Sequence, residues 1–169
     1  MTLREVARRA GVSHTATYKH FASKLDLLRA IALPAFGEFT DALRSAATSV
    51  DLEAFENMGA AYVRFAMEHP VEFSFMFNRE LCLPPGEEDV LKDASLHSQN
   101  VLRGMLADLQ AAGITRADDL EQQVLTVWSY IHGLTTIILK APGFDGLPLE
   151  AAEQLARDGV RRMIAGLAA

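Results

Sequence analysis

The hydrophobic positions of this chain recur with the spacing of an α-helix, and no stretch alternates like a half-buried strand. Thr2 and Ser23 each precede by three residues an acid that can complete a capping box, and Gly11 suits the end of a helix. Pro34 either ends or kinks the helix that Ser23 opens, and apolar spacing resumes beyond it. The predicted helices cover about 2–10, 13–21, 24–43, 51–69, 87–112, 117–140 and 149–167, with a short aromatic piece at 71–77 and breaks at 83–89 and 141–148. The expected fold class is all-α.

The helix predicted at 117–140 carries apolar residues on every side, so it has to be buried on every side. A chain of 169 residues has few helices to cover it, and a second subunit would supply the rest. The helix at 149–167 has an apolar stripe with small members, such as Ala156 and Gly159, that permit close approach. We expect a homodimer in which these two helices and their symmetry mates form a four-helix interface. Ordinary core packing within one chain is the alternative interpretation.

Charge is distributed unevenly. The whole chain has a net charge of −6, yet residues 1–30 contain six Lys or Arg and two Asp or Glu, a net charge of +4. A basic head on an acidic body points to a polyanion partner, whereas a solvated charged surface is the alternative. The single cysteine, Cys82, excludes an internal disulfide and a cysteine zinc cluster. No metal and no cofactor is expected. With no signal peptide and no apolar run near the roughly 20 residues of a membrane span, the expected location is the cytoplasm.

The predicted helix at 13–21, SHTATYKHF, has almost no apolar face. With the preceding helix and the turn at Gly11 it forms a helix-turn-helix candidate. A helix of about nine residues is roughly 13 Å long, which suits a major groove about 12 Å wide. Its Ser, Thr, His and Lys side chains are donors and acceptors of the kind that contact base edges and phosphates. Double-stranded DNA is therefore the expected partner.

The spacing T-x-x-x-V-A-x-x-A-G-V-S-x-x-x-x-Y-x-x-F-x-x-K-x-x-L, from Thr2 to Leu27, resembles the DNA-binding signature of the tetracycline-repressor (TetR) family of one-component bacterial regulators. EHPVEFSFMF at 68–77 and VWSYIHGL at 127–134, with its Trp-x-x-x-His-Gly pattern, resemble the C-terminal domain of one subgroup. Members of the family have a further helix before the position of Thr2, so we expect that helix to be missing from a chain that starts at Met1.

The resemblance implies a helix-turn-helix DNA-binding domain at 1–33 and a helical ligand-binding and dimerisation domain at 34–169. The DNA-binding residues that it implies are Thr2, Arg4, Ser13, His14, Thr15, Thr17, Tyr18, Lys19, His20 and Lys24. The residues that would hold the motif together are Val6, Ala7, Ala10, Val12, Phe21 and Leu28. We interpret the remaining basic residues of the head, Arg8, Arg9 and Arg29, as solvated surface side chains.

In the family the body binds a small molecule, which implies a small apolar or aromatic effector here. The candidate ligand-binding residues are Met58, Tyr62, Phe65, Phe73, Met76, Phe77, His97, Met105, Trp128 and His132. Ligand sites are mostly apolar with a few placed polar groups, and His97 and His132 are candidates for those groups. The alternative for the two histidines is a structural hydrogen bond, and for the others plain core packing.

The expected function is a DNA-binding transcriptional regulator, a ligand-responsive repressor that releases its operator when the body binds a small molecule; the sequence does not decide between repression and activation. The alternative is a dimerising small-molecule sensor without competent DNA binding, because of the missing first helix. An enzyme is disfavoured and no catalytic residue is assigned. The chain contains no Glu-x-x-His pair, phosphate loop, Gly-x-Ser-x-Gly or His-Glu-x-x-His.

Overall fold

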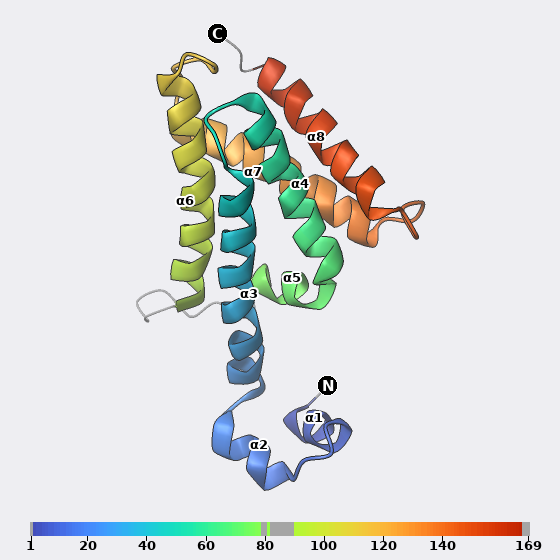
Figure 1. Cartoon of the computed structure of the whole chain (residues 1–169). Helices are drawn as coiled ribbons and strands as arrows, with labels where there is room; N and C mark the ends of the chain where they lie inside the picture. Colours follow the sequence, from blue (N-terminus) through green and yellow to red (C-terminus); the bar gives the residue numbers. More distant parts are fainter. Residues whose placement is uncertain (1, 79–80, 82–89, 167–169) are drawn as a thin grey trace.

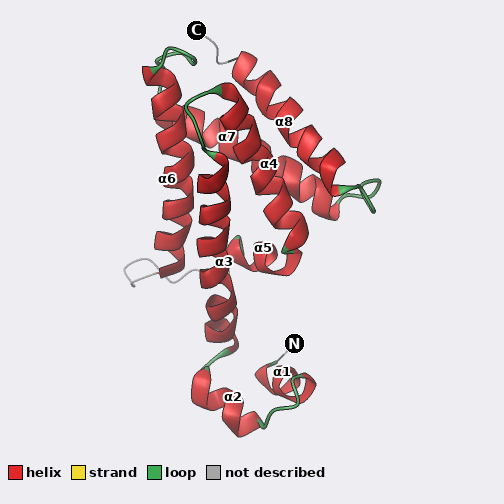
Figure 2. Cartoon of the chain, in the orientation of Figure 1, coloured by secondary structure: helices red, strands yellow, loops and turns green. Residues whose placement is uncertain are grey.

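The computed structural model describes residues 2–78, 81 and 90–166, including every side chain in them except those of His14, Ala16 and Thr17. Over these residues the chain forms eight helices. In Figure 2 the described residues are coloured as helix or loop and none as strand. The helices are α1 (Leu3–Arg9), α2 (His14–His20), α3 (Lys24–Ala46), α4 (Leu52–Glu68), α5 (Pro70–Met76), α6 (Val90–Ala111), α7 (Leu120–Lys140) and α8 (Leu149–Ala165). The predicted all-α fold is confirmed.

The helices form a small head and a larger body that share α3 (Figure 1). The head consists of α1, α2 and the beginning of α3, and the C-terminal half of α3 runs into the body beside α6. Helices α4 and α5 also pack against α3, and α8 lies along α4. Because α3 belongs to both parts, its two ends face different surroundings.

Helix α3 continues through Pro34 from Lys24 to Ala46, so the proline does not end it. The capping box at its start is confirmed: Asp26 N donates to Ser23 Oγ at 3.1 Å, and Ser23 N donates to Asp26 Oδ2 at 2.9 Å. Pro34 has no N–H to donate, which removes the helical partner of the Ala30 carbonyl. Both residues are exposed, where water can donate to that carbonyl instead. The helix therefore crosses the predicted domain boundary at 33/34 without a break.

Other helix ends follow the capping side chains. Ala54 N donates to Asp51 Oδ1 at 2.8 Å, which starts α4 at Leu52. Helix α7 starts at Leu120, later than the predicted residue 117, because the Asp119 carboxylate accepts hydrogen bonds from the backbone N–H groups that follow it. The described part of α6 starts at Val90, and the expected start near residue 87 lies outside the described residues.

Helix α8 packs closely on α4 through small residues. Ala152 and Ala156 are completely buried, and a Cβ added to Gly59 of α4 would lie 2.8 Å from Val160 Cγ2 of α8. That distance is shorter than any ordinary carbon–carbon contact, so a residue larger than glycine would push the two helices apart. The close packing of α4 and α8 therefore requires glycine at position 59.

Two nearly buried carboxylates add charge pairing to the same interface. Arg161 Nε of α8 donates to Glu56 Oε1 of α4 at 2.8 Å, and Arg64 Nε of α4 donates to Glu153 Oε1 of α8 at 2.5 Å. The hydrogen bond from Arg64 holds the pKa of Glu153 below its usual value, against the opposite effect of burial. Losing Arg161 would leave the nearly buried Glu56 carboxylate without this partner, which is costly. Glu153 has a second partner, because Arg157 Nη2 lies 3.4 Å from its Oε2.

Gly59→Ala tests the helix contact. The substitution should destabilise the protein by about 1–3 kcal/mol, because the buried, β-branched Val160 cannot rotate away cheaply. Gly104→Ala is the matched control: it also lies inside a helix, but a Cβ there meets nothing within 4 Å, so a gain of up to about 1 kcal/mol is expected from helix propensity. Urea unfolding of both variants and of Gly59→Ala/Val160→Ala measures the difference. Equal effects of the two single substitutions would contradict the close contact.

Candidate nucleic-acid interface and ligand cavity

The turn between α1 and α2 depends on Gly11. Its φ of +68° lies in the left-handed region that glycine adopts at low cost. The apolar side of α1 packs inward through Leu3 and Ala7, both buried. Val12 is 50% exposed and Ala10 is exposed as well, so their predicted role in holding the motif together is wrong for this structure. In the described head no element packs over this side of the turn.

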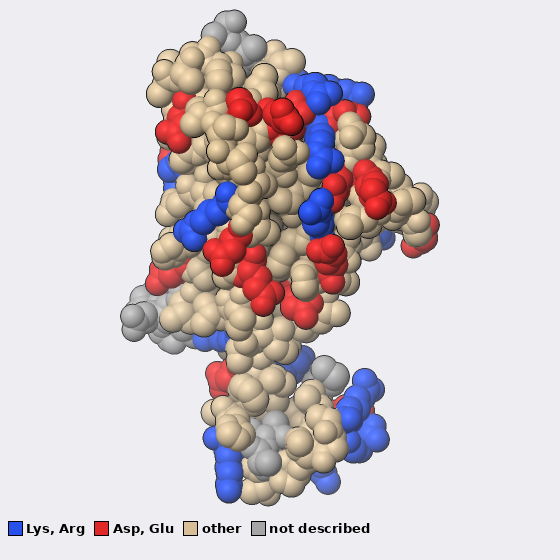
Figure 3. Space-filling view, viewed as in Figure 1, with Lys and Arg blue, Asp and Glu red and all other residues tan. Residues whose placement is uncertain are grey.

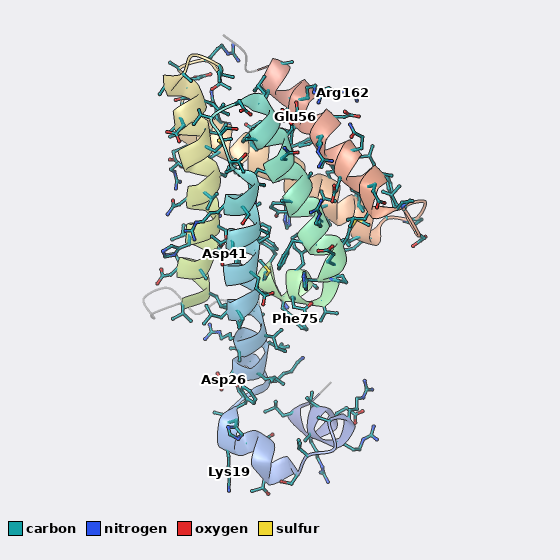
Figure 4. The ribbon with its side chains drawn as sticks, viewed as in Figure 1. Lys19, Asp26, Asp41, Glu56, Phe75 and Arg162 are labelled. Carbon is teal, nitrogen blue, oxygen red and sulfur yellow. The ribbon has the colours of Figure 1, made fainter. Side chains whose placement is uncertain are left out.

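Most of the predicted DNA-binding side chains lie on the surface of the head. Those that the structure describes as exposed are Thr2, Arg4, Ser13, Thr15, Tyr18, Lys19, His20 and Lys24. The side chains of His14 and Thr17 lie outside the described residues. Figure 4 shows Lys19 on α2 at the end of the head farthest from the body. The exposed α2 is therefore placed where a large partner can reach it.

The other polar groups of the head have structural partners. Glu5 N donates to Thr2 Oγ1 at 3.2 Å, which is one half of the predicted capping box. The Glu5 carboxylate accepts from Arg8 Nη2 and Arg9 Nε, each at 2.9 Å, and these bonds hold its pKa below the usual value. Both arginines remain largely exposed, as predicted. On the face in Figure 3, the charged residues of the head are mostly Lys and Arg, whereas the body carries Asp and Glu interspersed with Lys and Arg.

Arg29 differs from the prediction that it is a solvated side chain. Its Nε donates to the Leu81 carbonyl at 2.8 Å, and its Nη2 is buried with no hydrogen-bond partner among the described residues. This bond ties the head end of α3 to the segment that follows α5. The sequence pattern could not reveal it, because the two residues are 52 positions apart.

The body contains an apolar cavity of about 50 Å³ between α3, α4, α6, α7 and α8. Its lining residues are Phe36, Phe39, Leu43, Phe55, Met58, Gly59, Tyr62, Phe77, Ser95, Ser98, Gln99, Leu102, Val127, Trp128, Ile131 and Val160. Pockets that hold drug-sized ligands measure about 300–1,000 Å³. A molecule of that size could enter only if the surrounding side chains and helices moved apart.

One wall of the cavity continues into an aromatic cluster around His132. Tyr62 Oη and His132 Nδ1 share a hydrogen bond of 2.9 Å, and the His132 ring stacks on Phe73 with centroids 5.8 Å apart. Phe77 meets the same ring edge-on at 4.7 Å, and Trp128 lies 6.0 Å from it. Burial raises the pKa of Tyr62 well above its ordinary value. Burial also lowers the pKa of His132, and the positive charge of Lys140 lowers it further.

The predicted ligand-binding residues separate into three groups. Met58, Tyr62, Phe77 and Trp128 line the cavity, and His132 and Phe73 contact Tyr62 behind its wall. Phe65 and Met76 are buried in the surrounding core. His97 and Met105 lie instead along a surface groove between the end of α3 and α6, where His97 is exposed and bonds the Asp93 carbonyl at 2.8 Å. The structure thus brings six of the ten together at the cavity.

Sequence reasoning missed all of the cavity lining on α3 and α6. Phe36 and Phe39 of α3, and Ser98 and Gln99 of α6, recur at helical spacing like any core-facing residues. That pattern marks the inner face of a helix, and it does not distinguish a residue that borders a cavity from one in full contact. The polar residues Ser95, Ser98 and Gln99 on an inward face were the one available signal.

Two family models match the chain. Residues 1–31 match the family described as bacterial regulatory proteins, tetR family, and residues 55–163 match the tetracyclin repressor-like C-terminal domain. The chain belongs to the TetR family. As a TetR-family protein it is a DNA-binding transcriptional regulator, and the predicted resemblance is confirmed.

Solved structures agree with this TetR-family fold. A Rhodococcus sp. RHA1 protein of unknown function is 30% identical, with a TM-score of 0.78, over 100% of this chain and 86% of that one. The TetR-family transcriptional regulator PfmR from Thermus thermophilus is 24% identical, with a TM-score of 0.81; the match covers 100% of this chain and 90% of PfmR. The fatty acid degradation regulator FadR from Bacillus halodurans is 17% identical, with a TM-score of 0.68; the match covers 98% of this chain and 88% of FadR. No curated protein matched the chain.

Residues 2–78, 81 and 90–166 give no sign of a metal site or of a membrane span. No cluster of three or more His, Cys, Asp or Glu in this part of the chain could hold a metal ion. None of its helices is both long enough and apolar enough to span a membrane.

The lowered pKa of His132 gives a pH prediction. The unfolded chain takes up this proton near the ordinary value of 6.5, before the folded chain does. The free energy of unfolding should therefore be fully retained above about pH 6.5 and decline as the pH falls towards the lower folded pKa. His132→Asn should reduce that decline between about pH 6.5 and 5, whereas His97→Asn on the exposed surface should leave it unchanged. Thermal unfolding of the three proteins across this range is the measurement, and identical profiles would contradict the burial of His132.

Proposed function

We propose that this chain is an effector-controlled repressor that acts as a homodimer and releases its operator when a small apolar or aromatic molecule enters the body. The observation that carries the proposal is the path of α3. Its first residue is the exposed Lys24 of the head, and Phe36 and Phe39 farther along line the cavity. A molecule that separates the cavity walls therefore acts on the same helix that supports the DNA-facing head.

The proposed DNA contacts divide into two kinds. Exposed side chains of α2 and the preceding turn, including Ser13, Thr15 and Tyr18, would face the bases and sugars of the major groove. Thr2, Arg4 and Lys24 would contact phosphates, and the N-terminus of α3 adds a favourable dipole for the phosphate that Lys24 binds. Lys19 and His20 lie beside them, and the same roles are proposed for His14 and Thr17.

Release of DNA would follow from the small size of the cavity. A drug-sized effector has to displace Phe36, Phe39 or their neighbours, and a close-packed core transmits such a shift. Phe77 meets Phe36 edge-on, with centroids 5.9 Å apart, and the segment after Phe77 carries the carbonyl that binds Arg29. In a dimer the two recognition helices have to lie about 34–36 Å apart to enter successive major grooves. An effector that favours another spacing weakens DNA binding by linkage.

The proposed dimer interface consists of α7 and α8. These are the helices that the sequence predicts at about 117–140 and 149–167. Within one chain α7 is not buried on every side: Leu125 is 52% exposed and Ile137 49%, and Leu155 of α8 is 42% exposed. A Cβ at Gly133 of α7 would meet nothing within 4 Å, although glycine inside a helix costs about 1 kcal/mol. A partner helix packed against this face would account for both the apolar exposure and the glycine.

The second candidate function is a sensor that dimerises without binding DNA. It is less well supported, because a DNA-binding family model matches residues 1–31 and the described head exposes the polar and basic side chains that contact would need. A gel shift with the DNA that flanks the gene for this chain distinguishes the two. The sensor would leave that DNA unshifted at every protein concentration.

Lys24→Ala tests DNA binding through a phosphate contact. It should weaken binding to this flanking DNA, with a salt dependence (log K against log salt) that is shallower by about one unit, because one counterion fewer is released. The melting temperature should change little, since Lys24 is exposed. Arg44→Ala, an exposed basic residue at the opposite end of α3, is the matched control and should bind like the wild type. Unchanged affinity and salt slope for Lys24→Ala would argue against the assignment.

Ile137→Glu tests the interface. Burying a carboxylate against an apolar partner is costly, so sedimentation velocity at micromolar concentration should show a dimer for the wild type and a monomer for this variant. Val71→Glu on α5, where the valine is 58% exposed, is the control and should remain dimeric. A wild-type monomer, or a dimer unaffected by Ile137→Glu, would place the interface elsewhere or remove it.

A further inference from the structure

The chemistry of the cavity wall restricts what the effector can be. Of the sixteen residues that line the cavity, all of them in the described part of the chain, none is Asp, Glu, Lys, Arg or His. An ionised ligand would lose its hydration there without gaining an opposite charge from this lining, and such a transfer is very costly. These walls therefore disfavour the binding of a charged effector.

The polar groups of the lining are concentrated on one helix. Ser95, Ser98 and Gln99 lie on one face of α6, because residues three and four apart are neighbours on a helix surface. Ser98 Oγ already bonds Thr40 Oγ1 at 2.7 Å and the Ala94 carbonyl at 3.3 Å. On the opposite side, the Tyr62 hydroxyl is held by His132. The hydroxyls of Ser98 and Tyr62 are thus already used within the fold.

Ser95 and Gln99 are different. No hydrogen bond joins the Ser95 hydroxyl or the Gln99 amide to another group in the described part of the chain, and both side chains are partly exposed at the cavity. A glutamine amide offers two N–H donors and a carbonyl acceptor, and a serine hydroxyl offers one donor and an acceptor. The hydrogen-bonding groups of the lining that remain available to a ligand are therefore the uncharged Ser95 hydroxyl and Gln99 amide, which lie next to each other on α6.

We propose that the effector is an uncharged molecule with a compact apolar body and one neutral hydrogen-bonding group, such as a hydroxyl or carbonyl, that Gln99 and Ser95 receive. The proposal rests on the proposed function, because it takes this cavity to be the effector site. The apolar body lies among Phe36, Phe39 and Trp128, and Gln99 orients it. Neutral alcohols are accepted in preference both to carboxylates of the same skeleton and to hydrocarbons that lack the polar group.

The chain carries its own reporter for the test. Trp128 is its single tryptophan and lines the cavity, so its fluorescence responds to occupancy of this site. Three probes share one phenylbutyl skeleton and do not absorb at the wavelength that excites tryptophan: 4-phenylbutan-1-ol, 4-phenylbutanoate and butylbenzene. Titrating each into the full chain at about neutral pH should give binding of the alcohol at least about tenfold tighter than that of the carboxylate. Equal or tighter binding of the carboxylate, or no binding of the alcohol, would overturn the proposal.

Two variants test the role of the α6 side chains. Gln99→Leu should weaken binding of the alcohol about three- to tenfold, the range expected for one lost hydrogen bond, and leave butylbenzene unchanged or tighter. Ser95→Ala is a smaller change that can be measured if Gln99→Leu does not fold. It should also weaken binding of the alcohol. His97→Asn, outside the cavity, is the control. Alcohol affinity that survives both Gln99→Leu and Ser95→Ala would overturn the assignment of the polar contact.

The same titration separates this inference from the proposed function. Release of the flanking DNA by the alcohol is measured in parallel with Trp128 fluorescence. Selective alcohol binding without release of DNA would support the inference about the cavity and contradict effector control. Release of DNA by the carboxylate rather than by the alcohol would support effector control and contradict the inference.

Discussion

The continuity of α3 is the constraint on which the rest of this molecule depends. The helix starts at the capping box of Ser23 and Asp26, passes through Pro34 and ends at Ala46. Because α3 is one continuous helix from Lys24 to Ala46, the cavity residue Phe36 and the head lie on the same element. The exposed position of Pro34 matters here, since water can serve the carbonyl that the proline leaves without a partner.

The α4 and α8 side of the body is packed more extensively than the walls of the cavity that face α3. Helix α8 approaches α4 closely at Gly59 and Val160, and the pairs of Glu56 and Glu153 with arginines hold the two helices in register. In the proposed mechanism, the walls formed by α3, α6 and α7 are the ones that an entering molecule displaces. The bond from Arg29 to the Leu81 carbonyl gives the displaced region a second connection to the head.

Several parts of the fold and site could be predicted from local sequence. Helical periodicity, the capping residues Thr2 and Ser23 and the turn at Gly11 depend on neighbours within a few positions, and the structure agrees with each. Val12 was predicted to help hold the motif and is instead half exposed. Its burial depends on which element covers the turn, and spacing along the chain does not contain that information.

The sequence by itself determined the all-α class, the helix-turn-helix and the polar, accessible character of α2, because these follow from period, capping and composition over short windows. Only the tertiary structure decided that Tyr62 bonds His132, 70 positions away, that the Ser98 hydroxyl bonds Thr40, and that Gln99 lines the cavity. An inward helical face looks the same in sequence whether it closes against another side chain or borders a space. Which of the two occurs is set by the summed volumes and angles of five packed helices, and those exist only in the folded chain.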